Sequence, residues 1–161
     1  MKRILILPVL ILTLLVANPA FSADLEKGAA AYKSGDYTTA LREYTPAAKQ
    51  GNADAQYSLG IMYDNGTGVI QDYRTAVKWW TLAAEQGHAY AQVNLGWMYN
   101  EGRGVPQDYV RAHMWYNIAA SSGNKHAVKN RDIVARKMSP FSIEEAQLLA
   151  RKCVRKNYKG C

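Results

Sequence analysis

Two stretches, YDNGTGVIQDYRTA at residues 63–76 and YNEGRGVPQDYVRA at residues 99–112, decide the fold of this chain. Each contains a Gly-x-Gly turn, then Gln-Asp-Tyr and, three residues after the Tyr, an Ala. Closely spaced glycines are also typical of loops that bind a phosphate through backbone N–H groups. Such a loop should follow a β-strand or continue as Gly-Lys-Ser/Thr, whereas this one follows a helical pattern and continues as Gly-Val. The pattern therefore indicates an internal repeat.

The spacing of the two copies is constant over a long part of the chain. Subtracting 63 from 99 gives an offset of 36 residues, which also relates Gly60 to Gly96. Residues 24–51 contain a third, shorter copy that lacks the Gly-x-Gly turn. Each copy holds two runs of apolar and small residues at helical spacing, which predicts a pair of helices. A hairpin of this kind cannot bury its own apolar face, so the copies should stack into an all-α solenoid.

Short polar residues and glycines mark where the helices should begin and end. Three aspartates at the repeat spacing should cap the second helix of each hairpin: Asp36, Asp72 and Asp108. Three glycines should close those helices: Gly51, Gly87 and Gly123. The glycines of the two turns should supply positive φ angles: Gly66, Gly68, Gly102 and Gly104. Ser142 and Glu145 predict a capping box at the last helix, and Pro46 should bend the helix that contains it.

Residues 53–87 and 89–123 resemble Sel-like repeats (SLR), relatives of the tetratricopeptide repeat. The resemblance rests on motifs that recur in order in both: Leu-Gly-x-x-Tyr, Gly-x-Gly-Val, Asp-Tyr, Trp-Trp or Trp-Tyr, Ala-Ala and a closing Gly. It implies an α-solenoid of antiparallel helical hairpins with a right-handed superhelical twist. It also implies an adaptor that binds a protein or peptide in a concave groove lined by the first helices of the hairpins.

These patterns predict a domain organisation. Residues 1–22 form a signal peptide, and residues 23–161 form a single repeat domain. Within that domain we expect a shortened first repeat at residues 24–51 and full repeats at residues 52–87 and 88–123. Residues 124–161 depart from the motif, because Arg131 and Asp132 replace its Leu-Gly pair, and should form a divergent capping hairpin.

The N-terminal residues indicate export. Lys2 and Arg3 precede an apolar run from Ile4 to Ala17, which is followed by small residues up to Ala23. A basic, then apolar, then small-residue order is typical of a secretory signal peptide, and we expect cleavage after Ser22. The apolar run is shorter than the roughly 20 residues of a membrane-spanning helix. We therefore expect a periplasmic or secreted protein without a lipid anchor.

The C-terminal part of the chain is basic and holds both cysteines. Residues 124–161 contain 10 Lys and Arg against 3 Asp and Glu, whereas residues 23–123 contain 8 against 10. This end should be a solvated face, with contact to nucleic acid, an anionic envelope surface or an acidic partner as the alternatives. In an exported chain, Cys153 and Cys161 should form a disulfide, which would stabilise the terminus by about 2–3 kcal/mol.

The partner-binding residues should lie on the first helices, at positions that differ between repeats and are not needed for stacking. These candidates are Tyr57, Ile61, Asp64, Tyr90, Val93, Trp97, Asn100 and Lys129. Trp97 is the strongest of them, because the neighbouring repeat has Ile61 there and interface hot spots are rich in Trp. The alternative is that Trp97 packs against an adjacent helix, as aromatic residues at helical spacing usually do.

A catalytic alternative arises from three short motifs. Residues 122–125 (Ser-Gly-Asn-Lys), 63–65 (Tyr-Asp-Asn) and 33–35 (Lys-Ser-Gly) resemble the motifs of serine penicillin-recognising enzymes. Some cysteine-rich relatives in this repeat class have been described as penicillin-binding or β-lactamase-like. Here the motifs occur in reverse order and fall at turns where Gly, Asn and Ser are common. We therefore expect a non-catalytic protein, with a cell-envelope enzyme of that type as the alternative.

Other function classes find less support in the sequence. The three histidines lie on no zinc spacing, so we expect no metal and no cofactor. The chain holds no known nucleic-acid motif, and its repeat body is slightly acidic, so we expect no nucleic-acid partner.

Overall fold

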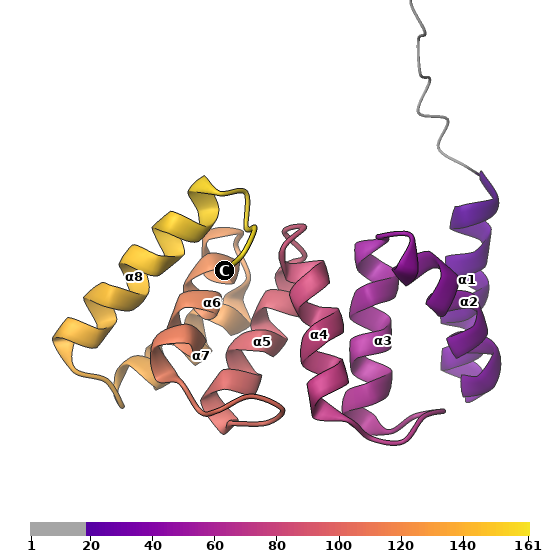
Figure 1. Cartoon of the computed structure of the whole chain (residues 1–161), viewed down its shortest axis with the longest axis horizontal. Coiled ribbons are helices and arrows are strands. Elements are labelled where there is room, and N and C mark those ends of the chain that lie inside the picture. The colour runs from indigo at the N-terminus through magenta and orange to yellow at the C-terminus, as the bar shows by residue number, and fades with distance from the viewer. Residues whose placement is uncertain (1–18) are drawn as a thin grey trace, which may run out of the picture.

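The computed structural model describes residues 19–161, which form eight helices and no strand (Figure 1). In chain order they are α1 (Pro19–Ser34), α2 (Tyr37–Lys49), α3 (Ala53–Asn65), α4 (Tyr73–Ala84), α5 (Ala89–Glu101), α6 (Tyr109–Ser121), α7 (Lys125–Ala135) and α8 (Pro140–Arg155). Consecutive helices pack against each other from α1 to α7, and α8 packs on α6. The predicted all-α solenoid of stacked hairpins is confirmed.

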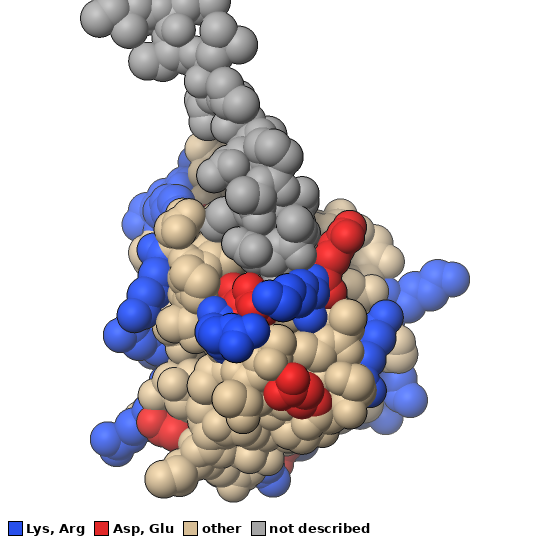
Figure 2. Space-filling view, turned by 90° about the vertical axis from the view of Figure 1, so that its right-hand side faces the viewer, with Lys and Arg blue, Asp and Glu red and all other residues tan. Residues whose placement is uncertain are grey.

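The signal-peptide prediction lies outside the described residues, apart from residues 19–22, which belong to α1. Among the described helices, none combines the length and the apolar character that crossing a membrane requires. At the α1–α2 end of the array, shown in Figure 2, acidic and basic side chains lie next to each other. Glu43 accepts there from Lys27 at 2.8 Å and from Arg42 at 3.0 Å.

The predicted starts are confirmed for the second helix of the first three hairpins. Asp36 accepts from the Thr39 N–H, Asp72 from Arg74 and Thr75, and Asp108 from Arg111. The predicted closing glycines are not the C-caps, which are Gln50, Glu85 and Ser122; Gly51, Gly87 and Gly123 follow them with positive φ angles. Helix α2 runs on through Pro46 to Lys49, so the proline does not interrupt it.

The first helices are capped by residues that the sequence reading did not identify. Asn52, His88 and Asn124 lie 36 residues apart, and each accepts from the backbone N–H three residues later. The repeat offset was the signal that could have found them.

The predicted start of the last helix is wrong. Ser139, and not Ser142, is the N-cap of α8, and its hydroxyl accepts from the Ser142 N–H at 3.1 Å. Pro140 occupies the first helical position, where its fixed φ angle suits the helix and its missing N–H costs nothing. Ser142 therefore lies inside the first turn, and Glu145 does not complete a capping box.

Each of the first three hairpins contains a helical glycine that admits an aromatic ring. The ring of Tyr116, in α6, covers Gly96, in α5, and a Cβ atom at Gly96 would lie 2.7 Å from the Tyr116 ring. Gly60 is covered in the same way by Trp80, and Gly28 by Tyr44. The covering rings Tyr44, Trp80 and Tyr116 lie 36 residues apart, so the repeat carries a packing contact as well as a sequence motif. In α7, Asp132 stands 36 residues after Gly96, so this helix lacks the glycine.

Replacing Gly96 with Ala should destabilise the protein by about 1–3 kcal/mol, the usual cost of overpacking a core. The direction is informative, because a Gly-to-Ala change inside a helix otherwise stabilises it by up to about 1 kcal/mol. Urea unfolding followed by circular dichroism measures the difference. Asn94→Ala, on the same helix and half-buried, is the control and should be neutral or stabilising. A stabilising Gly96→Ala change would contradict the packing described here.

The C-terminal residues return from α8 toward the α4–α5 turn (Figure 1). The N–H of Gly160 donates to Oε1 of Glu85 at 2.9 Å, and the Tyr158 ring lies against Gly87. Cys153 and Cys161 are placed as a disulfide pair with their Cα atoms 5.5 Å apart. This geometry meets the requirement of the predicted bond, which would tie the C-terminal residues to α8.

Candidate functional site

The predicted partner-binding residues lie on the first helices α3, α5 and α7. The repeat offset places them at equivalent positions: Tyr57, Val93 and Lys129 in one row, Ile61 and Trp97 in a second, and Asp64 and Asn100 in a third. Tyr90 lies in the first turn of α5. We call the surface formed by these eight residues the first-helix face.

Trp97 is half-buried and packs against two core clusters. Part of this side chain therefore has the packing role that was the alternative to partner binding. The guanidinium of Arg103 lies over its ring, with Cζ 4.7 Å from the ring centroid. Arg103 also lies 5.4 Å from the ring of Tyr73, and its Nη1 donates to the Tyr73 hydroxyl at 3.4 Å. A cation over an aromatic face is stabilising by about 0.5–1 kcal/mol at exposed sites. Arg103 therefore covers one face of the Trp97 ring.

Arg103 was missed by the sequence reasoning, which considered only the glycines of the Gly-x-Gly turns. The signal was present, because the turn of the preceding repeat has Thr67 at the same position. Arg103 and Tyr73 belong to neighbouring repeats and lie 30 residues apart, so no periodic pattern within one repeat brings them together.

Asp64 and Asn100 occupy equivalent positions at the ends of α3 and α5 but have different surroundings. Burial raises the pKa of Asp64, and the positive charge of Arg103 opposes that rise. Its Oδ1 is buried and has no hydrogen-bond partner among the described residues. The Oδ1 of Asn100 accepts from Nζ of Lys137 at 3.3 Å. Asp64 is thus a partly buried carboxyl group whose charge is stabilised by Arg103.

The start of α5 carries a group of three rings, Tyr57, His88 and Tyr90, which we call the aromatic cluster. Tyr57 stacks on His88 with ring centroids 4.5 Å apart, and Tyr90 lies 6.2 Å from each of them. Burial raises the pKa of Tyr57. Tyr90 is 59% exposed. In this cluster Tyr57 and His88 are half-buried and stacked on each other, and Tyr90 is the accessible ring.

The other predicted residues contribute less to a defined site. Ile61 and Val93 are half-buried and pack against core clusters, and Lys129 is exposed on α7. The structure thus groups Tyr57 with Tyr90, brings Trp97 close to Arg103, and leaves Lys129 at the edge of the face.

His88 joins the aromatic cluster to the helix cap of α5. Its Nδ1 accepts from the Ala91 N–H at 3.2 Å, and its Nε2 lies 3.3 Å from Oδ1 of Asp54. Burial lowers the pKa of His88 below its ordinary value of about 6.5, although Asp54 opposes the shift. A proton on Nδ1 would abolish the cap, because that nitrogen could no longer accept.

The stability of the protein should therefore fall as pH drops through about 6.5, the pKa of histidine in the unfolded chain. The unfolded state then binds more protons than the folded state, and this continues down to the lowered pKa of His88. Asn caps α3 and α7 at the equivalent position, so His88→Asn keeps a cap that does not titrate. We expect the variant to be less acid-sensitive by about 1 kcal/mol, the typical worth of a cap.

Thermal unfolding between pH 8 and pH 5 measures this difference. His126→Asn, which changes an exposed histidine on α7, is the matched control and should leave the profile unchanged. Some acid sensitivity should persist in His88→Asn, because burial also lowers the pKa of His113. Parallel profiles for His88→Asn and the unaltered protein would refute the role of His88.

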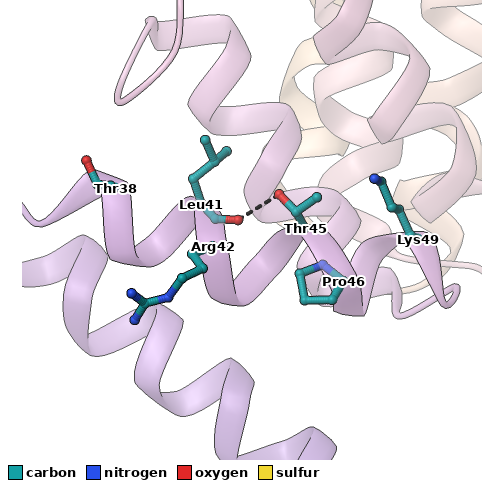
Figure 3. A pocket seen from close by; sticks show the side chains of 6 residues that line it. All are labelled: Thr38, Leu41, Arg42, Thr45, Pro46 and Lys49. Carbon is teal, nitrogen blue, oxygen red and sulfur yellow. Dashed lines mark hydrogen bonds between the residues drawn. The ribbon is translucent and has the colours of Figure 1, made fainter.

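A surface hollow of about 490 Å³ lies away from the first-helix face, on α2 (Figure 3). Its lining residues are Thr38, Leu41, Arg42, Thr45, Pro46 and Lys49. All of them come from a single helix, and the Thr45 hydroxyl is already bonded to the Leu41 carbonyl at 2.6 Å. One face of one helix cannot enclose a ligand, so the hollow does not compete with the first-helix face as a site.

The three motifs behind the catalytic alternative lie at separate turns. Ser122 is the C-cap of α6, whereas residues 63–65 end α3, and residues 33–35 comprise the last two residues of α1 and the glycine after it. Within the described part of the chain, no hydrogen bond joins any two of these motifs. Residues 19–161 also contain no group of three acidic, His or Cys side chains placed to hold a metal ion. The structure adds nothing that favours the catalytic alternative.

Comparisons with known proteins agree with this architecture. The Sel1 repeat family matches residues 53–88 and 89–124. A Sel1 repeat protein from Oxalobacter formigenes is 38% identical, with a TM-score of 0.64, over 70% of this chain and 87% of that one. The chain is also similar to c5321, a protective antigen of uropathogenic Escherichia coli with an SLR fold. That match has 31% identity and a TM-score of 0.81.

The two structural relatives differ in length. The match to c5321 covers 86% of this chain but only 31% of c5321, so this chain spans about a third of that antigen. A search of curated proteins finds no significant match. Two findings establish the family of this chain. The Sel1 repeat family matches two of its repeats, and the chain is 38% identical to a Sel1 repeat protein of which it covers 87%. The chain belongs to the Sel1 repeat family.

Proposed function

We propose that this protein is a non-catalytic scaffold that binds a protein or peptide partner across its first-helix face. Sel1 repeat proteins are typically scaffolds for protein interactions. The observation that carries the proposal is Tyr90, which is 59% exposed although it adjoins the half-buried Tyr57 and His88. An exposed aromatic ring beside a rigid base resembles the side chains that anchor protein interfaces.

The remaining residues of the face give it polar character. Asp64 supplies a carboxylate, Arg103 a guanidinium over Trp97, and Lys129 an exposed ammonium. Protein interfaces commonly combine a few aromatic anchors with a polar rim of this kind. The face therefore suits a peptide segment that lays one apolar side chain on Tyr90 and forms hydrogen bonds further along the first helices.

The proposal includes export to the periplasm or the outside of the cell. The order of basic, apolar and small residues over residues 1–23 supports a cleaved signal peptide. The pairing of Cys153 with Cys161 also fits an oxidising compartment, since disulfides are rare in a reducing cytosol. The mature chain would then be residues 23–161, as one repeat domain.

The test compares two substitutions of exposed aromatic residues. Tyr90→Ala removes the accessible ring of the aromatic cluster, and Phe141→Ala removes a ring that is 76% exposed on α8, away from the first-helix face. Mature protein and both variants serve as baits for envelope and culture-medium fractions, and the affinity of any retained protein is then measured after purification. An interface hot spot is worth 2 kcal/mol or more, so Tyr90→Ala should weaken binding by about 30-fold or more.

The two variants separate the possible outcomes. Weakening by Tyr90→Ala with unchanged binding by Phe141→Ala supports the first-helix face. Equal affinities for Tyr90→Ala and the unaltered protein would show that the partner binds elsewhere. Circular dichroism and urea unfolding confirm that both variants keep their fold, which we expect because neither side chain belongs to a core cluster.

A further inference from the structure

A second surface with a distinct composition lies between α6 and α8. A hollow of about 420 Å³ opens there, and we call it the α6–α8 hollow. Ile118 and Ala150, which are 1% and 2% exposed, lie at its floor, and the half-exposed Val154 forms part of its wall. Pockets of about 300–1,000 Å³ with a mostly apolar lining are typical of binding sites. The hollow can thus receive an apolar side chain from outside.

The rim of the α6–α8 hollow is basic. Arg151 and Arg155 line it and are exposed, and neither forms an ion pair with any described residue. They lie four positions apart on one helix, where like charges repel each other. No Asp or Glu stands three or four positions from either of them. A negatively charged ligand would relieve this repulsion.

The two ends of the solenoid differ in the balance of basic and acidic side chains. At the α1–α2 end, basic side chains pair with Glu43, and Figure 2 shows both signs of charge there. At the α8 end, residues 124–161 carry 10 basic and 3 acidic side chains. Basic residues in the last turn of a helix complement its dipole, but that effect does not require an apolar hollow beside them.

We propose that the α6–α8 hollow binds an acidic segment of a partner protein. An apolar side chain of that segment lies over Ile118 and Ala150, and carboxylates on either side of it pair with Arg151 and Arg155. A recessed apolar floor with two cations at its rim fits a protruding side chain better than it fits a flat, anionic membrane. This surface is separate from the first-helix face, so the protein can hold two partners at once.

A synthetic peptide tests the proposal directly. The probe is a fluorescent peptide with one Leu between two pairs of Glu, and its binding to the mature protein is followed by fluorescence anisotropy. The test variant is the double reversal Arg151→Glu/Arg155→Glu. The matched control is Lys152→Glu/Lys156→Glu, which changes the net charge equally and with the same spacing, Lys156 being the C-cap of α8. Lys152 and Lys156 border a different hollow, next to Cys161.

We expect the arginine reversal to weaken peptide binding at least tenfold and the lysine reversal to weaken it less than threefold, since close charge pairs outweigh distant ones. Replacing the Leu of the peptide with Ala should also weaken binding several-fold, because it removes the apolar contact. Equal weakening by the two reversals, or no effect of the Leu-to-Ala change, would overturn the proposal in favour of non-specific attraction.

A membrane is the competing occupant, and vesicles test it. Vesicles of phosphatidylglycerol and phosphatidylcholine that bind the protein while the peptide does not would overturn the proposal. Tyr90→Ala should leave peptide binding unchanged, so a failure of this inference is distinguishable from a failure of the first-helix face.

Discussion

Replacing Trp80 with Ala should destabilise the protein by about 3–5 kcal/mol, which is typical of a fully buried aromatic side chain. Trp80 is 1% exposed and lies in the largest core cluster. Its indole covers Gly60, and its Nε1 donates to the Tyr57 carbonyl at 3.1 Å. The substitution thus opens a cavity and removes the side-chain hydrogen bond to the Tyr57 carbonyl. Because small domains are stable by only about 5–15 kcal/mol, the variant should be close to unfolding.

Urea unfolding monitored by far-ultraviolet circular dichroism measures this loss. Trp79→Ala is the control, because Trp79 is the adjacent residue of the same type but is only half-buried. It should lose clearly less stability than Trp80→Ala. If the two variants were equally destabilised, the assignment of Trp80 as the central packing residue of the second hairpin would be wrong.

Replacing Gly104 with Ala should cost about 2–5 kcal/mol for two separate reasons. Its φ angle is +69°, a left-handed conformation that costs a residue with a Cβ atom roughly 1–2 kcal/mol. A Cβ atom at Gly104 would also overlap the carbonyl group of Tyr73, at the start of α4 in the preceding repeat. Backbone atoms at the start of a helix cannot move aside as a flexible side chain can. The overlap should therefore add about 1–3 kcal/mol, the usual cost of overpacking.

Gly123→Ala separates the two contributions to this loss. Gly123 also has a positive φ angle, +85°, but nothing lies within 4 Å of the position that a Cβ atom would occupy. We expect Gly123→Ala to cost about 1–2 kcal/mol, the conformational part alone. The difference between the two urea midpoints, at an unchanged slope, then measures the overlap with Tyr73. Equal midpoints would mean that the loop moves away from α4.

Much of the fold could be predicted because each decisive pattern is local and repeated. An Asp cap bonds to N–H groups two or three residues away, and a glycine with positive φ depends on its own backbone. The one wrong helix start, at Ser142, came from two competing local signals. Ser139 with Pro140 outweighed the Ser-x-x-Glu pattern, because a proline in the first helical turn favours that start.

The candidate site was less predictable, because its contacts cross between repeats. Sequence reasoning selected Tyr57, Tyr90 and Trp97 as candidates from their variation between copies. It missed His88, whose role depends on the ring of Tyr57 in the preceding hairpin. It also missed Arg103, which reaches Tyr73 and Trp97 from a loop. Nothing in the period of a single repeat encodes such neighbours.

The Gly-x-Gly turns combine a feature that the sequence predicts with one that depends on the stacking of the hairpins. The sequence by itself determined that Gly102 and Gly104 adopt positive φ angles, because a turn with two glycines between helices has few other uses. Only the tertiary structure decided that the second glycine also allows the loop to approach the preceding hairpin. Gly68 lies in the same way against Tyr37, one repeat earlier. Backbone conformation is a local property, whereas the close approach of two backbones depends on how the hairpins stack.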